Sequence, residues 1–230
     1  MKRLLNTFIL AIISTTAVMA QSTFQSALKA SAKKGSTIYG VVECDGKPMA
    51  GVAVSDGYQI ALTDKKGVYQ LQSAKRNGNV FITIPSGYEA PTSVENCDPI
   101  PQFWADLTAD AQTPERHDFS LKAVDNKKHV MLTITDVHLS NQLGDIDQFN
   151  TVVMPRIREE VEKYRSQGIP VYTMCMGDSS FDRFWYDFLF EISDFRNALR
   201  QNNYPTTMFH TMGNHDNDGA TTPFADTDFN

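Results

Sequence analysis

The chain has 230 residues, which is enough for one large domain or two small ones. Its hydrophobic content of 41% with 21% charged residues is ordinary for a soluble globular protein. The 21 basic and 27 acidic residues give a formal charge of −6, which argues against a non-specific nucleic-acid binder because such proteins carry a basic face.

Residues 1–20 have the pattern of a secretory signal peptide. Lys2 and Arg3 form a positive start, residues 4–18 are mostly apolar, and small residues precede a cleavage site after Ala20. Polar residues interrupt the apolar run, so it is a poor transmembrane span. We therefore expect an exported protein, periplasmic or secreted, with no stable membrane insertion.

The region from residue 36 to residue 122 has an all-β pattern. It follows a polar stretch, residues 21–35, that predicts a flexible lead or a short frayed helix. Short runs of β-branched and aromatic residues are separated by turns rich in Gly and Asp, which is typical of a small β-sandwich. The expected strands lie at 37–42, 52–55, 60–63, 68–71, 80–84 and 117–121.

Three phrases in this β region resemble the transthyretin-like or carboxypeptidase-regulatory-like sandwiches. They are G-x-V at 40–42, GKPMAGVAVSDG at 46–57 and TDKKGVYQL at 63–71. The resemblance implies a structural or targeting module without chemistry of its own. The functional alternative is glycan binding by exposed aromatic side chains, and the other interpretation is that these aromatics fill the core or a domain interface. The candidates are Tyr58, Tyr88, Phe103 and Trp104.

The cysteines are Cys44, Cys97 and Cys175. Export permits a disulfide, and Cys44 with Cys97 is the candidate pair because both lie in the predicted β domain. Two unpaired thiols are the alternative. Cys175 lies in an apolar run and is expected to be a small core residue.

A short polar linker, residues 123–128, separates the β region from a region with a different hydrophobic period. Near-continuous apolar runs predict parallel strands that are covered on both faces, and helical spacing predicts helices between them. The strands are expected at 129–134, 169–176 and 206–212, and the helices at 149–164 and 184–199. Pro155 predicts a kink or a first helical turn. The alternation predicts a right-handed α/β unit.

Three short motifs stand at the carboxyl ends of the three expected parallel strands. They are Thr135-Asp136-Val137-His138, Gly177-Asp178 and Gly213-Asn214-His215-Asp216. Open α/β sheets bind ligands beyond the carboxyl ends of their strands, so these side chains are expected to meet in one crevice. Carboxylate, imidazole and amide groups are suitable ligands for Zn, Mn, Fe or Mg.

The order D-x-H, GD, GNHD resembles the calcineurin-like metallophosphoesterases, which are two-metal phosphoester hydrolases. The resemblance covers about residues 129–230 and implies two divalent ions such as Mn, Fe or Zn. Asp136 and His138 would bind the first ion, Asp178 would bridge both ions, and Asn214 would bind the second. The ions would supply hydroxide near neutral pH and neutralise charge on the phosphoryl oxygens.

The same resemblance implies a catalytic pair. His215 would stabilise or protonate the leaving oxygen, and Asp216 would orient that imidazole. The expected substrate is a small-molecule phosphoester, with no nucleic-acid partner, and the oligomeric state stays open. His210, inside the third strand, is expected to be a core histidine.

The family's later histidines, a lone His and a G-H-x-H run, have no counterpart between His215 and Asn230. We therefore expect residues 129–230 to be a truncated catalytic domain, an incomplete α/β sandwich that follows the β-sandwich. The second metal site is expected to be incomplete, and the sequence leaves the activity of the chain open.

Two other functions remain open from the sequence. Gly177-Asp178-Ser179-Ser180 could be the nucleophile motif of a GDS-type serine esterase, with Ser179 as the nucleophile. The chain could also be a non-catalytic exported binding protein that uses its β-sandwich to recognise a glycan or a partner.

Overall fold

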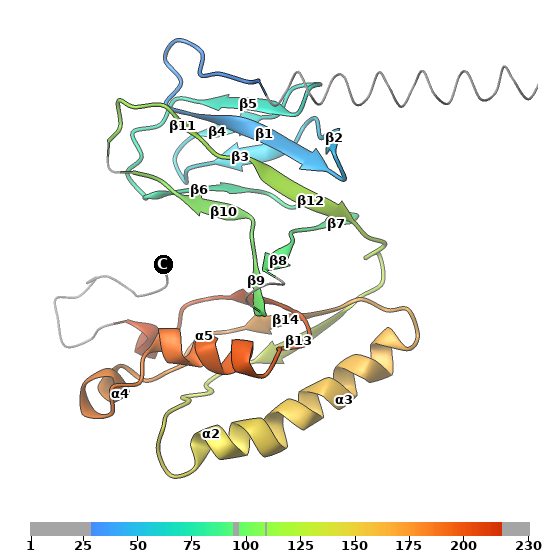
Figure 1. The fold of residues 1–230 in the computed structure, drawn as a ribbon, viewed down its shortest axis with the longest axis vertical. Helices are drawn as coiled ribbons and strands as arrows, with labels where there is room; N and C mark the ends of the chain where they lie inside the picture. Colours follow the sequence, from blue (N-terminus) through green and yellow to red (C-terminus); the bar gives the residue numbers. More distant parts are fainter. Residues whose placement is uncertain (1–28, 94–96, 109, 218–230) are drawn as a thin grey trace, which may run out of the picture. The chain divides into compact units, whose positions relative to one another are not determined.

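The computed structural model describes residues 29–93, 97–108 and 110–217, which form a β-rich mixed structure with several separate sheets and few helices (Figure 1). They divide into two units. Unit 1 runs to Pro91 and resumes over Gln102–Val124, and unit 2 contains Thr92–Pro101 and continues from Asp125. The expected signal peptide lies outside the described residues and stays a prediction. No helix in the described part of the chain combines the length and the apolar character needed to cross a membrane.

Unit 1 contains two sheets. The first is organised around β1 (Ile38–Cys44), which is parallel to β11 (Glu115–Arg116) and β12 (Phe119–Ala123) and antiparallel to β2 (Lys47–Pro48) and β5 (Val68–Leu71). A further strand, β7 (Tyr88–Glu89), pairs with β12. The second sheet has the order β10 (Trp104–Asp106), β6 (Asn79–Ile82), β3 (Ala53–Ser55), β4 (Ile60–Leu62).

The two sheets of unit 1 share one buried hydrophobic cluster. Val42 of β1 and Phe119 of β12 contribute from the first sheet, and Val54 of β3 and Ile82 of β6 contribute from the second. Along β5 and β6 buried and half-buried residues alternate, as expected for strands with one face on a core. Each of the six strands predicted in this region corresponds to an observed strand within a few residues. The assignment to a transthyretin-like family stays a prediction.

One stretch of the predicted β domain groups with unit 2. Thr92–Pro101 forms β8 (Thr92–Ser93) and β9 (Asp98–Pro101), an antiparallel pair. Asp98 is buried and accepts hydrogen bonds from Arg196 at 2.7 Å and from Arg200 at 2.5 Å. Burial alone would raise the pKa of Asp98, but the two guanidinium groups outweigh it and lower that pKa.

The cysteines are all free thiols, so the candidate pair of Cys44 and Cys97 is not formed. Cys97 belongs to the stretch that groups with unit 2, and the assumption that both lie in one β domain was wrong. Cys175 is completely buried in the hydrophobic cluster of unit 2, as predicted for a small core residue.

Unit 2 contains a parallel sheet of three strands in chain order, β13 (Val130–Ile134), β14 (Val171–Cys175) and β15 (Thr207–His210). Between β13 and β14 lie α2 (Asp145–Gln148), the π-helical turn η1 (Phe149–Val153) and α3 (Met154–Arg165). Between β14 and β15 lie α4 (Asp182–Asp187) and α5 (Ile192–Gln201). The predicted alternation of strands and helices is therefore present, and the fuller α/β sandwich stays a prediction.

One detail of the helices agrees with the prediction and one differs from it. Pro155 occupies the first turn of α3, and the π-helical turn before it accommodates a residue that has no N–H to donate. The helix predicted at 184–199 is divided into α4 and α5. Leu189 has a left-handed backbone (φ 51°), and α5 restarts at Glu191, whose N–H donates to Asp194 at 2.8 Å in a capping box.

Helices α3 and α5 lie on the same face of this sheet. Met154 of α3 and Phe195 of α5 pack in one cluster with Cys175 and Met208 of the strands. A shared face is the consequence of right-handed connections between sequential parallel strands. On β13 the other face is open, since Met131 is 43% exposed. The prediction that the strands are covered on both faces is therefore wrong for β13 within the described residues.

Candidate metal centre

The first two motifs lie side by side because the pairing of β13 with β14 continues beyond both strands. The N–H of Asp136 donates to the carbonyl of Gly177 at 3.2 Å, and the N–H of His138 donates to the carbonyl of Asp178 at 3.0 Å. Leu139 continues the ladder with a bond to Ser179 at 3.1 Å. Backbone hydrogen bonds thus hold the D-x-H loop against the G-D loop at the carboxyl ends of the two strands.

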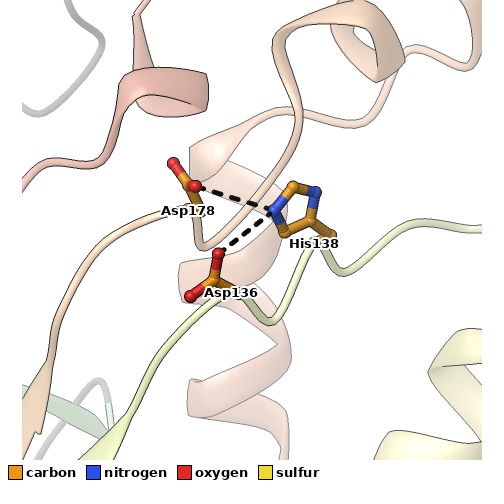
Figure 2. A group of neighbouring side chains, drawn as sticks. All are labelled: Asp136, His138 and Asp178. Atoms are coloured by element: carbon orange, nitrogen blue, oxygen red, sulfur yellow. Dashed lines mark ion pairs between the residues drawn. The ribbon is translucent and has the colours of Figure 1, made fainter.

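This pairing brings Asp136, His138 and Asp178 together. Nε2 of His138 lies 3.7 Å from Oδ2 of Asp178 and 4.0 Å from Oδ1 of Asp136, and the ring points at both carboxylates (Figure 2). One donor atom from each residue falls within 4.8 Å of the others. Exposure falls from 65% for the Asp136 side chain to 12% for that of Asp178, so the group is open to solvent on the side of Asp136.

Each carboxylate keeps one oxygen for this group and uses the other in the fold. Oδ2 of Asp136 accepts the hydroxyl of Thr135, and Oδ1 faces His138. Oδ1 of Asp178 accepts the N–H of His215 at 2.9 Å, and Oδ2 faces His138. The side chains are therefore oriented before any ligand binds.

All three residues have a left-handed backbone, with φ of 50° at Asp136, 44° at His138 and 52° at Asp178. Non-glycine residues seldom adopt this conformation, although Asp and His tolerate it better than most, and such strain concentrates at functional sites. Six other described non-glycine residues share this conformation, so the strain agrees with a site here without identifying one by itself.

The third motif is held against the second through two glycines. A Cβ on Gly177 would lie 2.3 Å from the backbone nitrogen of Gly213, and a Cβ on Gly213 would lie 2.0 Å from Oδ1 of Asp178. Real Cβ atoms do not approach other atoms so closely, so neither position accepts a side chain without displacing the loops. The glycines of G-D and G-N-H-D are needed for this close approach.

Asp216 does not have the role that the resemblance implies. Its carboxylate is completely buried and accepts the N–H groups of Asp178 at 2.8 Å, Ser179 at 3.0 Å and Gly213 at 2.8 Å. Both oxygens are used to join the second and third loops. The expectation that Asp216 orients the imidazole of His215 is therefore wrong.

The carboxylate that contacts His215 belongs to Asp182, at the start of α4. Oδ1 of Asp182 accepts a hydrogen bond from Nδ1 of His215 at 3.0 Å. The ring of Phe181 stacks on His215 with centroids 4.1 Å apart, and the rings of His138 and His215 are 5.2 Å apart. Sequence reasoning missed Asp182 and Phe181. An acidic residue four positions after the G-D aspartate, in the first turn of a helix, was the available signal.

Asn214 is the first residue of η2 (Asn214–Asp216) and is exposed. It directly precedes His215, whose N–H donates a hydrogen bond to Asp178 of the metal group. Its amide has no hydrogen bond to any described residue. Its expected role as a metal ligand stays a prediction.

The donor set fits a divalent ion. Two carboxylates and one imidazole are the ligands of Zn, Mn and Fe sites. Ligand atoms about 2.0–2.2 Å from one ion lie roughly 3–4 Å apart, and the His138 contacts of 3.7 and 4.0 Å fall in this range. Asp136, His138 and Asp178 could hold one ion with small adjustments of their side chains.

The remaining sequence candidates do not join the group. Ser179 is completely buried, and its Oγ lies 3.3 Å from Sγ of Cys175. A buried hydroxyl with a thiol for a neighbour cannot act as an esterase nucleophile, so the structure contradicts the serine esterase alternative. His210 lies edge-on to Phe195, and burial lowers its pKa to about 4, which keeps it neutral at physiological pH.

Comparison with known families gives one match. A family model described as the N terminal of Calcineurin-like phosphoesterase matches residues 36–124, less than half of the chain. No curated protein and no solved structure matches the chain. The match covers the region that we predicted to precede a metallophosphoesterase catalytic domain, and the metal group lies outside it. The comparison therefore suggests the metallophosphoesterase family, from a part of the chain that does not carry the D-x-H, G-D and G-N-H-D motifs.

Proposed function

We propose that the protein is a metal-dependent phosphoester hydrolase of the calcineurin-like type. The observation that carries the proposal is the convergence of Asp136, His138 and Asp178, within 4.8 Å of one another, at the carboxyl ends of two parallel strands. The family match to residues 36–124 supports it independently, because it rests on a different part of the chain.

In this proposal Asp136, His138 and Asp178 would hold one divalent ion, and Asp178 with Asn214 would hold a second. When bound, such ions lower the pKa of a coordinated water and neutralise charge on a phosphoryl group. The contribution of the chain is to fix the ligands: the bond from the N–H of His215 orients the Asp178 carboxylate.

His215 acts on the leaving oxygen. Its Nδ1 donates to Asp182, so Nε2 is the ring nitrogen that can approach a substrate. A carboxylate at Nδ1 fixes the orientation of the ring, and the free ring nitrogen is a group that can exchange a proton with a leaving alkoxide or phenolate. Asp182 is a positioning residue in this scheme. The proposed substrate is a small phosphoester, and the signal-like pattern of residues 1–20 supports a periplasmic or secreted location.

The test is hydrolysis of p-nitrophenyl phosphate and bis(p-nitrophenyl) phosphate by the metal-loaded protein. Removing metal with EDTA should abolish hydrolysis, and Mn²⁺ or Zn²⁺ should restore it. Asp136→Asn should lower kcat/KM by more than about 100-fold, beyond what loss of an outer-shell partner costs. The matched control is Asp147→Asn, at an exposed position of α2 that is not part of the group, which should leave kcat/KM unchanged.

Two outcomes would contradict the proposal. Hydrolysis that survives EDTA would mean that the reaction does not use this group. A protein that binds metal through Asp136 and His138 but hydrolyses neither ester would be a metal-binding protein without the proposed activity.

A further inference from the structure

Unit 1 contains a hollow of about 920 Å³, which lies at the upper end of the range for small-ligand sites. Four stretches line it: residues 32–37 before β1, residues 56, 58 and 59 between β3 and β4, residues 72–74 and 76 after β5, and residues 111, 112 and 114. All of them belong to unit 1, so the hollow is independent of the metal group.

Hydrogen bonds fix the walls of this hollow. The side chain of Gln70 on β5 accepts the N–H of Lys33 at 3.0 Å and donates to the carbonyl of Ser31 at 3.0 Å, which ties the stretch before β1 to the sheet. Oδ1 of Asp56 accepts the N–H groups of Tyr58 at 2.9 Å and Gln59 at 2.6 Å, which fixes the turn. A ligand would therefore meet a preformed surface and would not have to order it.

The charge that lines the hollow is positive, in contrast to the chain as a whole. Its cationic residues are Lys33, Lys34 and Arg76, and Asp56 is its acidic residue. Asp56 is 2% exposed, and its oxygens are used by the turn and by the hydroxyl of Ser73. Among the described residues no carboxylate forms an ion pair with Lys33, Lys34 or Arg76. The three cations are thus available to an anionic ligand, in a chain of formal charge −6.

Tyr58 gives the hollow an exposed aromatic ring. Of the four aromatics considered for glycan binding, Tyr88 and Phe103 pack against the hydrophobic core of unit 1, and Trp104 lies on β10 outside the hollow. Tyr58 is 61% exposed and lines it. An exposed aromatic face beside polar groups is suited to stacking on the C–H face of a sugar ring.

We propose that this hollow binds an acidic oligosaccharide. Tyr58 stacks on a sugar ring, and Lys33, Lys34 and Arg76 pair with its carboxylate or sulfate groups. The amides of Gln59 and Gln72, which also line the hollow, offer both donors and acceptors to hydroxyl groups. Such amides favour a sugar over a lipid surface, and the net negative charge of the chain disfavours a nucleic-acid strand.

The test is calorimetric titration of the full mature chain with a galacturonate hexamer and, separately, with a neutral maltohexaose. EDTA is present in both titrations, so that the result does not depend on the metal group. The galacturonate hexamer should bind, the neutral hexamer should bind at least about tenfold more weakly, and added salt should weaken the acidic ligand selectively.

Variants locate the binding. Tyr58→Ala and Arg76→Ala should each weaken binding by about tenfold, because each removes a stacking face or a charge-assisted hydrogen bond. Tyr58→Phe keeps the ring and should retain most of the affinity. Lys65→Ala removes an exposed cation of the β4–β5 turn that does not line the hollow, and should have no effect. The three side chains replaced in these four variants are exposed, so the thermal unfolding midpoint should not change.

Three results would overturn the proposal. The first is that the galacturonate hexamer does not bind at millimolar concentration. The second is that the Lys65→Ala control loses as much affinity as Arg76→Ala. In the third result the hexamer does not bind, but anionic phospholipid vesicles or single-stranded DNA do, and Tyr58→Ala and Arg76→Ala abolish that binding. The ligand of the hollow would then be the lipid or the DNA and not a sugar.

Discussion

Replacing Gly213 by alanine should separate the second and third loops and weaken metal binding by Asp136, His138 and Asp178. The added Cβ would lie 2.0 Å from Oδ1 and 2.4 Å from the backbone nitrogen of Asp178. The nitrogen is backbone and cannot rotate away, so the loops must move apart. An added methyl group in a well-packed place costs about 1–3 kcal/mol of unfolding free energy. Because Asp178 itself must shift, affinity for Mn²⁺ or Zn²⁺ should fall by more than about tenfold, a loss of at least about 1.4 kcal/mol.

Urea unfolding and metal titration of the same samples measure the two effects. The control is Gly168→Ala, where the backbone is left-handed (φ 72°) and nothing lies within 4 Å of the added Cβ. That change should cost about 1–2 kcal/mol through backbone strain alone and leave metal affinity unchanged. A Gly213→Ala protein that binds metal as tightly as the parent would refute the argument that close approach of these loops orients Asp178.

Three further predictions concern charged groups. Asp182→Asn should lower kcat by about 10–100-fold without changing metal stoichiometry, because His215 loses its orienting carboxylate; equal loss of metal would show instead that Asp182 is a ligand. Asp98→Ala should destabilise unit 2 by about 3 kcal/mol and speed hydrogen exchange in β8 and β9, because it leaves two arginines unpaired; unchanged exchange would contradict this. Burial alone would raise the pKa of Glu115, but hydrogen bonds from the buried Lys75 and from Thr108 outweigh it and lower that pKa to about 2. The folded-state pKa is depressed, so its contribution of about 3 kcal/mol is present above pH about 4.5 and is lost as pH falls toward 2. Glu115→Gln should flatten that part of the pH dependence of urea unfolding, and an unaltered profile would contradict the assignment.

The sequence was most informative where local pattern determines structure. Apolar runs located β13, β14 and β15, and polar residues directly after them located Asp136, His138 and Asp178. Both inferences depend on residues that are close in sequence and on the rule that parallel strands share a carboxyl edge.

Features that depend on contacts distant in sequence were missed. The grouping of Thr92–Pro101 with unit 2 involves Asp98 and arginines about 100 residues later in the chain, for which a single sequence carries no signal. The contact with His215 was expected from Asp216 and is made by Asp182, and this error has the same origin. Both acids are near His215 in the fold, and only the backbone N–H groups around Asp216 show that its carboxylate is already used.

The most direct test of the metal centre is metal content after equilibrium dialysis against Mn²⁺ or Zn²⁺, measured for the parent, Asp178→Asn and Asp147→Asn. One oxygen of the Asp178 carboxylate accepts a hydrogen bond from His215 in the third loop, and the other oxygen faces His138. The parent and the Asp147→Asn control should bind metal equally, and Asp178→Asn should lose it. Full metal stoichiometry in Asp178→Asn would contradict the assignment of this carboxylate as the shared ligand and, with it, the proposed metal centre.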